Sequence, residues 1–299
     1  MNILVTGAAG QLGQACCRAL ADRGHRVMPT DHPAQAGVGL IPLDITDSDA
    51  VMDTVRRLRP DKILHCAAWT DVDAAERKEN VPKVWAVNAD GTRNLALAAR
   101  NVGAALLYIS TDYVFGDSAT RPHRPEDRDF CPLNVYGQAK LAGEEHVRSL
   151  LKHHYIVRTS WVFGPGGKSF VRTMLRLGNT SDSVRVIDDQ VGTPTYAPDL
   201  ARLLTDLLET DRWGVYHATN EGGYVSWCDF AREIFRQSGS STCVIPVSTA
   251  EYGLSAARRP LNSRLDKACL PANGFMPLPD WRDALGRYLR EIMNLQGLE

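Results

Sequence analysis

The sequence predicts an α/β fold in which a doubly wound parallel sheet is joined to a smaller, mainly helical C-terminal domain. The first half of the chain alternates between short apolar runs and longer segments with helical periodicity. Unbroken apolar runs are typical of parallel strands that helices cover on both faces. Beyond about residue 160 the alternation weakens, and Gly and Pro cluster in VFGPGGKSF and DDQVGTPTYAPDL.

Each element of this alternation can be assigned in order. The expected strands are residues 2–6, 26–30, 39–42, 62–66, 105–110 and 155–159. The expected helices between them are residues 11–22, 47–59, 81–102 and 135–151. Later helical patterns lie at 199–208, 228–237 and 279–294. Strand–helix–strand units with right-handed crossovers build a parallel sheet.

The pattern divides the chain into two expected domains. Residues 1–157 form the sheet domain, and residues 158–299 form the second domain. We expect the chain to return to the first domain near residues 185–222. A length of 299 residues suits one large or two medium domains.

Composition excludes several classes of protein. A net charge of -1 gives no electrostatic basis for binding nucleic acid or a membrane surface. No apolar run approaches the ~18 residues of a membrane span. The first residues, MNILVT, predict a buried strand and not a signal peptide, so we expect a cytoplasmic protein. The seven cysteines show no CxxC pair, which favours free thiols in a reducing compartment.

A glycine pattern follows the first expected strand. Gly7, Gly10 and Gly13 lie in GAAGQLG, which leads directly into the first helix. Glycines let a backbone approach a pyrophosphate, and a helix N-terminus offers free N–H groups to an anion. This position in the chain predicts a Rossmann-type dinucleotide site, although a purely structural turn gives the same pattern.

Residues at later strand ends extend this prediction. Asp31 ends the second strand, where a carboxylate can accept hydrogen bonds from ribose hydroxyls and would repel a 2′-phosphate. On these grounds Asp31 favours NAD over NADP, but a surface turn would also accommodate it. Asp44 and Ile45 can flank the adenine, and Ala67 and Ala68 are small enough for a cofactor to pass.

A second constellation suits carbonyl reduction. Tyr136 and Lys140 are four residues apart, on one face of an expected helix, and Thr111 ends the fifth strand. A phenol can protonate the alkoxide that hydride transfer produces, and a nearby ammonium makes that proton easier to give. A hydroxyl at Thr111 can orient the carbonyl oxygen. Ligands of open α/β sheets bind at the strand ends, so these groups should meet there.

With these motifs the chain resembles the extended short-chain dehydrogenases/reductases. GAAGQLG, STDYVF and YGQAK carry that likeness. More narrowly, QVGTPTYAPDLA and RRPLNSRLD make the chain resemble the dTDP-4-dehydrorhamnose reductase family. The likeness extends over nearly the whole chain. It implies reduction of the C4 ketone of dTDP-4-dehydro-β-L-rhamnose by NADPH or NADH, the last step toward dTDP-L-rhamnose for polysaccharides.

The resemblance also implies roles for individual residues. Thr111, Tyr136 and Lys140 would be catalytic. The cofactor would be held by Gly7, Gly10, Gln11, Leu12, Asp31, Asp44, Ile45, Ala67, Ala68, Thr70, Val72, Tyr136 and Lys140. The dTDP-sugar would meet Thr111, Asp112, Trp161, Lys168, Phe170, Gln190, Thr193 and Arg259. Core packing for Trp161 and a surface salt bridge for Arg259 stay open, as do plain loop roles for Lys168, Phe170, Gln190 and Thr193.

Two departures from the family pattern bear on these roles. STDYVF is followed by Gly116 and Asp117, where members usually place the acidic residue first, so we expect a shifted turn. Some members are magnesium-dependent dimers that use a glutamate of the first helix, but QLGQACCRAL contains no acid. We therefore expect no metal in catalysis, and a monomer or weak homodimer. The histidines, among them His65, His123, His153 and His154, show no spacing with His or Cys that indicates a metal site.

Two other functions remain open at this stage. An epimerase or dehydratase acting on a nucleotide sugar would retain a tightly bound nicotinamide. Against a dehydratase, Asp112 is followed by Tyr113 where those enzymes place a glutamate. A regulatory subunit would bind cofactor and a partner enzyme without turnover, but it would not need the Thr, Tyr and Lys set.

Overall fold

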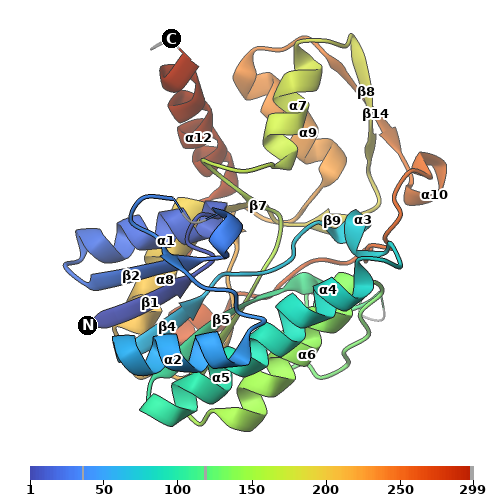
Figure 1. The fold of residues 1–299 in the computed structure, drawn as a ribbon. Coiled ribbons are helices and arrows are strands. Elements are labelled where there is room, and N and C mark those ends of the chain that lie inside the picture. Colours follow the sequence, from blue (N-terminus) through green and yellow to red (C-terminus); the bar gives the residue numbers. More distant parts are fainter. Residues whose placement is uncertain (36, 118–119, 297–299) are drawn as a thin grey trace.

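A seven-stranded parallel sheet forms the centre of the computed structural model, which describes residues 1–35, 37–117 and 120–296 (Figure 1). The doubly wound α/β fold class predicted from the sequence is confirmed. In spatial order the strands are β11 (Gly214–His217), β6 (His154–Thr159), β5 (Ala105–Thr111), β4 (Lys62–His65), β1 (Asn2–Thr6), β2 (Arg26–Asp31) and β3 (Ile41–Pro42). The order reverses between β1 and β4, which opens a crevice at the carboxyl ends of these strands.

Helices cover both faces of this sheet (Figure 1). On one face lie α1 (Gln11–Asp22) and α8 (Ala197–Leu208). On the other face lie α2 (Ser48–Leu58), α5 (Gly91–Val102) and α6 (Val135–Leu150). Along β1 the side chains alternate, since Ile3 and Val5 pack toward α1 and α8 while Leu4 packs toward α2 and α5.

The first-half elements differ from the predictions mainly at their ends, with one exception. The single helix expected over 81–102 is divided into α4 (Val81–Trp85), a π-helical segment (Ala86–Asp90) and α5. The buried Asn88 lies in this π turn, and its side chain pairs with the backbone of Trp69. Oδ1 accepts the Trp69 N–H at 2.8 Å, and Nδ2 donates to the Trp69 carbonyl oxygen at 3.1 Å. Hydrophobic periodicity does not report such a local exchange of hydrogen bonds.

The C-terminal part has its own core. Helices α7 (Phe170–Gly178), α9 (Trp227–Ser238) and α12 (Trp281–Gln296) pack with the parallel pair β8 (Ser183–Ile187) and β14 (Cys243–Val247). In Figure 1, α7, α9, β8 and β14 lie at the upper right and α12 lies to their left, all above the central sheet. The sequence did not predict β8 and β14, because each run is short and its pairing partner is distant in the chain.

Short elements join the two parts. The remaining strands form the pairs β7 (Val162–Phe163) with β10 (Thr195–Tyr196), β9 (Val191–Gly192) with β13 (Val225–Ser226), and β12 (Asn220–Glu221) with β15 (Leu278–Asp280). The short helices are α3 (Val72–Ala75), α10 (Thr249–Tyr252) and α11 (Cys269–Ala272). β11 and α8 follow residue 157 in the chain but belong to the central sheet and its helix layer. The domain boundary at residue 157 therefore stays a prediction. Among the described residues no helix is both long and apolar enough to cross a membrane.

Candidate active site

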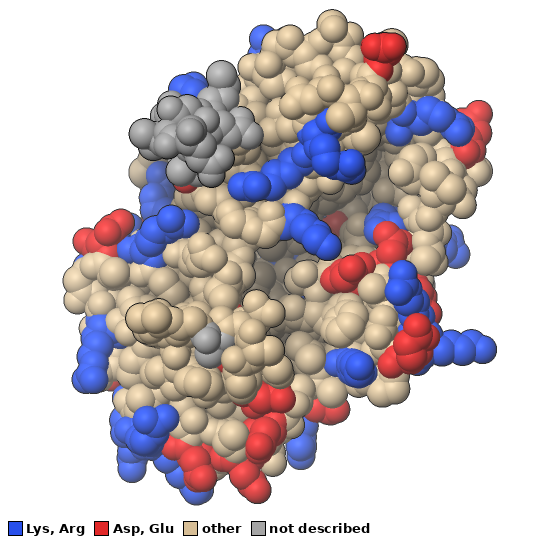
Figure 2. Space-filling model, turned by 45° about the horizontal axis from the view of Figure 1, so that its top comes forward, with Lys and Arg blue, Asp and Glu red and all other residues tan. Residues whose placement is uncertain are grey.

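A cavity of about 860 Å³ lies at the carboxyl ends of β1, β2, β4 and β5. Its lining comes from the sheet domain and from the C-terminal part together. Figure 2 shows the molecule hollowed between these two parts, with Lys and Arg side chains along the upper rim of the hollow. A concave, partly basic site at the switch point of a doubly wound sheet is where a nucleotide would be expected.

The turn between β1 and α1 forms one side of the cavity. Gly7 has a φ of +67°, a conformation that side chains other than glycine rarely adopt. A Cβ on Gly13 would lie 2.0 Å from the carbonyl oxygen of Gly7, so only glycine lets the helix begin this close to the turn. Helix α1 starts after Gly10 with no side-chain cap and no acidic residue in its first turn. Its free N–H groups fit an anion such as a pyrophosphate.

Asp31 lines the cavity and also supports this turn. One carboxylate oxygen accepts the backbone N–H of Ala9 at 2.8 Å, and the other accepts that of His32 at 2.7 Å. Asp44 lies beside it, accepts both the N–H and the hydroxyl of Thr46, and faces His32 at 3.6 Å. Hydrogen bonds from Thr46 outweigh burial and hold the pKa of Asp44 below its usual value.

Gln11 joins the two sides of the site. Its amide donates to the carbonyl oxygens of Gly164 and Gly166, each at 2.8 Å. The glycine turn is thereby tied to the loop that follows β7. The other residues expected around the cofactor lie in the same cavity lining: Gly7, Gly10, Leu12, Ile45, Ala67, Ala68, Thr70 and Val72.

Thr111, Tyr136 and Lys140 line the cavity together. Thr111 ends β5, and the other two lie one helical turn apart on α6. Burial raises the pKa of Tyr136 and the nearby Asp112 adds to it, whereas a hydrogen bond with the Thr111 hydroxyl acts in the opposite direction. Tyr136 therefore holds its proton at neutral pH, as a proton donor must.

Lys140 is buried behind Tyr136. Its ammonium donates to the carbonyl oxygen of Ile109 at 2.6 Å and lies 4.0 Å from the ring centre of Tyr108. Burial lowers the pKa of Lys140 to about 7, against the charge of Glu144, which raises it. A cation so placed favours loss of the proton from a neighbouring phenol.

Asp112 adds a carboxylate next to Thr111. Oδ1 accepts the Thr111 hydroxyl at 2.9 Å, while Oδ2 is buried and has no hydrogen-bond partner among the described residues. Burial raises the pKa of Asp112 to about 6. An unpartnered buried oxygen on the cavity wall suits a ligand hydroxyl.

Aromatic residues form the opposite wall. Trp161 has a φ of +50°, a strained conformation for a residue with a side chain. Its ring stacks on Trp227 with centroids 3.6 Å apart, and Phe170 packs on Trp227 at 4.6 Å. Lys168 is exposed at the rim of the same wall.

Arg259 reaches the cavity from the C-terminal segment. Its guanidinium donates to both oxygens of Asp73 on α3, at 3.1 and 2.7 Å, and Asp73 also accepts the N–H of Ala257. The ion pair holds Arg259 at the cavity, next to Tyr113. The structure therefore has both the salt bridge and the cavity position that the sequence left as alternatives.

Gln190 and Thr193 are not part of the cavity lining. Gln190 is buried and donates to the Thr249 hydroxyl at 3.1 Å, and Thr193 is buried with its hydroxyl near the carbonyl oxygen of Gly223. Their assignment to the nucleotide pocket stays a prediction.

Sequence reasoning missed several lining residues, of which Cys66 and Trp227 are two examples. Cys66 directly precedes Ala67 at the end of β4, so the strand-end rule could have included it. Trp227 begins α9, where nothing in the local pattern separates it from an ordinary core residue.

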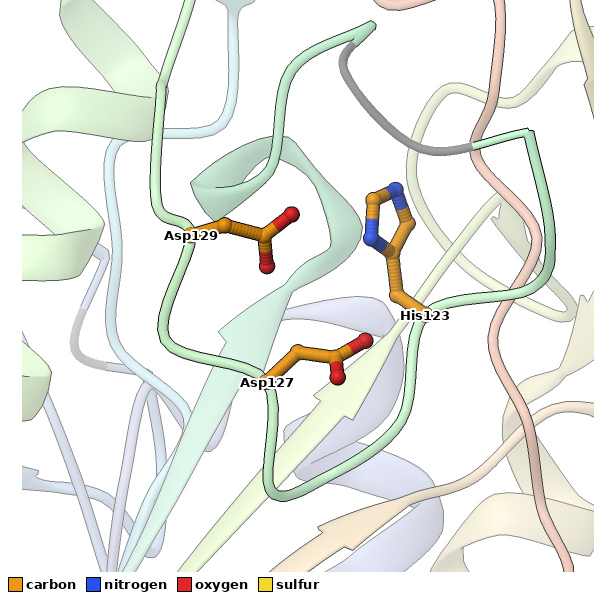
Figure 3. Close-up of side chains that lie close together, drawn as sticks. All are labelled: His123, Asp127 and Asp129. Carbon is orange, nitrogen blue, oxygen red and sulfur yellow. The ribbon is translucent and has the colours of Figure 1, made fainter.

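A histidine–carboxylate cluster lies outside this cavity lining, in the loop before α6. His123, Asp127 and Asp129 bring one possible ligand atom each within 4.8 Å (Figure 3). Both oxygens of Asp127 accept hydrogen bonds from Arg121, which lowers the pKa of Asp127 to about 2. Arginine thus neutralises the carboxylate that a cation would need, and we interpret the cluster as an ion-paired loop contact.

Comparison with known proteins gives concordant matches. The family model described as the RmlD substrate binding domain matches residues 1–294. A dTDP-4-dehydrorhamnose reductase of Streptomyces griseus is 44% identical, covering 94% of this chain and 91% of the relative. Spore coat polysaccharide biosynthesis protein SpsK of Bacillus subtilis (strain 168) is 39% identical, covering 97% of each chain. A crystal structure of dTDP-4-dehydrorhamnose reductase from Bacillus anthracis in complex with NADP has a TM-score of 0.89 at 39% identity, covering 97% of this chain and 99% of that one.

Proposed function

The chain belongs to the dTDP-4-dehydrorhamnose reductase family, and on that premise we propose that it reduces the C4 ketone of dTDP-4-dehydro-β-L-rhamnose to dTDP-β-L-rhamnose. The observation that carries the proposal is the shared cavity. The glycine turn, the Thr111–Tyr136–Lys140 set and the aromatic and basic wall all line one space.

The cofactor of the proposed reaction is NADPH or NADH. The turn fits a dinucleotide, because a Cβ at Gly13 would fill the space and α1 presents uncapped N–H groups. The Bacillus anthracis relative was crystallised with NADP, which supports use of the phosphorylated form. Both oxygens of Asp31 accept backbone N–H groups, which favours its charged form, so Asp31 still favours NADH over NADPH.

Tyr136 is the proposed general acid. When bound, the nicotinamide supplies the hydride that goes to C4 of the sugar. Tyr136 gives its phenol proton to the carbonyl oxygen, and the Thr111 hydroxyl orients that oxygen. The Lys140 ammonium stabilises the phenolate that remains. Thr111 and Lys140 are buried and Tyr136 is partly buried, which limits the access of bulk water to the proton.

The substrate is proposed to lie along the opposite wall. Lys168 and Arg259 carry the charge that a diphosphate requires, and Trp161 and Phe170 offer apolar surface beside the sugar. Asp112 Oδ2 can accept a sugar hydroxyl. We propose further that the protein acts in the cytoplasm, as a monomer or weak homodimer, in the last step of a pathway that supplies polysaccharide synthesis.

A coupled assay tests this function. dTDP-4-dehydro-β-L-rhamnose is generated in place, the protein is added with NADPH or NADH, and loss of nicotinamide absorbance is followed with product identification. Formation of dTDP-L-rhamnose is expected with both cofactors. No oxidation by folded protein that still binds nicotinamide would contradict the proposal.

The same preparation separates the alternatives. Stoichiometric nicotinamide in the purified protein would favour an epimerase or dehydratase. Absence of turnover on any sugar nucleotide, together with co-purification of a larger enzyme, would favour a regulatory subunit. The complete Thr111, Tyr136 and Lys140 set in one cavity argues against that last function, because binding alone does not require it.

A further inference from the structure

A buried carboxylate lies beneath the catalytic set and has no part in the proposed proton transfer. Glu144 is fully buried on α6. One of its oxygens accepts the Ser110 hydroxyl at 2.6 Å and Nε of Arg158 at 2.8 Å. The other accepts Arg158 at 2.8 Å and Arg148 at 2.6 Å. Burial alone would raise the pKa of Glu144, but Arg158 outweighs it and holds the pKa at about 2.

The partners of Glu144 come from both strands next to the cavity. Ser110 of β5 and Arg158 of β6 lie opposite one another in the parallel pairing of these strands. Ser110 directly precedes Thr111, while Lys140 lies one turn and Tyr136 two turns before Glu144 on the same face of α6. One carboxylate thus connects the helix that carries the phenol and ammonium to the strand that carries the hydroxyl.

The packing at this point leaves the helix little freedom. A Cβ on Gly143 would lie 2.4 Å from the Tyr108 hydroxyl, which itself donates to the carbonyl oxygen of Lys140 at 3.3 Å. This close approach of Gly143 to Tyr108 limits how far α6 stands from β5. Such packing does not fix the position of α6 along its own axis, whereas a directional ion pair does.

Stability alone does not account for the arrangement. Arg158 is also fully buried, and desolvation offsets most of the attraction in a buried ion pair. Apolar residues of similar volume are often as stable or more so, whereas charged hydrogen bonds fix one geometry.

We propose that Glu144 is a positioning residue, whose contacts with Ser110 and Arg158 set α6 so that Tyr136 and Lys140 meet Thr111 in the reductive geometry. The inference depends on the proposed function, because that function defines the geometry. Glu144 touches neither the cavity nor a reacting atom.

The charge of Glu144 also acts on Lys140. The groups that face Lys140 are Glu144 on its own helix, His65 and Cys66 at the end of β4, and Tyr108 of β5. Glu144 and Cys66 support the ammonium against burial. Loss of the Glu144 charge therefore lets Lys140 lose its proton at lower pH, so the decline of reduction at alkaline pH should begin earlier.

Three variants test the inference. Ser110→Ala removes the link to β5 and keeps the ion pair. Glu144→Gln removes the charge. Glu144→Gln with Arg158→Met removes both charges, so that no buried cation is left unpaired. Arg148→Met is the matched control, because it removes a Glu144 contact on the solvent side. Each is measured for kcat, KM, NADPH affinity by fluorescence, pH profile and unfolding temperature.

Ser110→Ala is expected to lower kcat about tenfold, with KM and NADPH affinity within about twofold, because misplacement affects the reacting geometry first. Glu144→Gln should lower kcat further and shift the alkaline limb to lower pH. The double variant should regain unfolding temperature relative to Glu144→Gln while kcat stays low. Arg148→Met should change kcat less than about threefold.

Wild-type kcat in folded Ser110→Ala and in the folded double variant would overturn the inference. A second measurement does not need turnover. Crystal structures of wild type and double variant with NADPH should show Tyr136 displaced from Thr111 in the variant. Superimposable positions of Tyr136 and Thr111 in the two structures would overturn the inference, whether or not the wild-type protein is active. An inactive wild-type protein would instead contradict the proposed function.

Discussion

The two walls of the cavity are built in different ways. The wall proposed to bind the cofactor (the cofactor wall) consists of the turns that follow β1, β2 and β4, where backbone groups and small residues such as Gly7, Gly13 and Ala67 form the surface. The wall proposed to bind the sugar nucleotide (the substrate wall) consists of large side chains, Trp161, Phe170, Trp227 and Arg259, from segments far apart in the chain. The first wall depends on local geometry, and the second depends on long-range contacts such as Arg259 with Asp73.

This difference predicts which measured parameter a substitution in each wall should change. A change in the cofactor wall alters the backbone path and should weaken NADPH binding. A change in the substrate wall removes one side chain and should raise KM for the sugar nucleotide. The proposed catalytic set lies where the walls meet, so its loss should lower kcat more than it changes KM or NADPH affinity.

The largest effect is expected where the walls meet. Tyr136→Phe removes the proposed proton donor and should lower kcat by about 10² to 10⁴, because general acid catalysis contributes that much. NADPH affinity should stay within about threefold, since the ring remains. Tyr216→Phe is the control, because Tyr216 lies on β11 and its hydroxyl donates to the Arg212 carbonyl oxygen. Full activity in Tyr136→Phe would remove Tyr136 from the mechanism.

Next in size is a change in the cofactor wall. Gly13→Ala places a methyl group 2.0 Å from the Gly7 carbonyl oxygen, so the turn must move away from the pyrophosphate position. We expect NADPH affinity to fall about 100-fold in fluorescence titration, as when misplaced groups lose their contacts. Gly37→Ala, which meets nothing within 4 Å, should bind normally. Equal affinities in the two variants would show that the turn does not hold the cofactor.

A smaller effect is expected from the substrate wall. Arg259→Met should raise KM for the sugar nucleotide about tenfold to 100-fold, since a charge-assisted pair to phosphate contributes about 1.5–3 kcal/mol. NADPH affinity should not change. Arg258→Met alters a neighbouring arginine that is 72% exposed and serves as the control. An unchanged KM in Arg259→Met would show that Arg259 does not bind the diphosphate and only forms its ion pair with Asp73.

The last prediction concerns stability and the buried histidines His65 and His217, and it changes no residue of the two walls. Burial lowers the pKa of His217 to about 3 and holds that of His65 well below its usual value. In the unfolded chain both should bind protons below about pH 6.5. At these pH values the unfolded state binds more protons than the folded state. The free energy of unfolding should therefore fall as the pH is lowered from about 6.5 to 5, by up to about 1.4 kcal/mol per pH unit for each histidine. Unfolding measured from pH 7 to pH 5 checks this, with a smaller slope expected in His217→Asn. A stability that does not change over this range would contradict it.

The sequence by itself determined most of the cofactor wall. Helix α1 and strand β1 have the predicted ends, the glycine turn follows β1, and Asp31 and Thr111 are the last residues of β2 and β5. Strand ends of a parallel sheet share one edge, so residues at those ends can be brought together without knowing any long-range contact.

Only the tertiary structure decided the substrate wall and the support beneath the site. The stacking of Trp161 on Trp227, the pairing of Arg259 with Asp73, and the burial of Glu144 with Arg158 each join segments that no local period relates. Gln190 and Thr193 show the same limit, because their motif does not reveal whether they face the cavity. Periodicity reports which face of an element is apolar, whereas pairing between distant segments is set by packing of the whole chain.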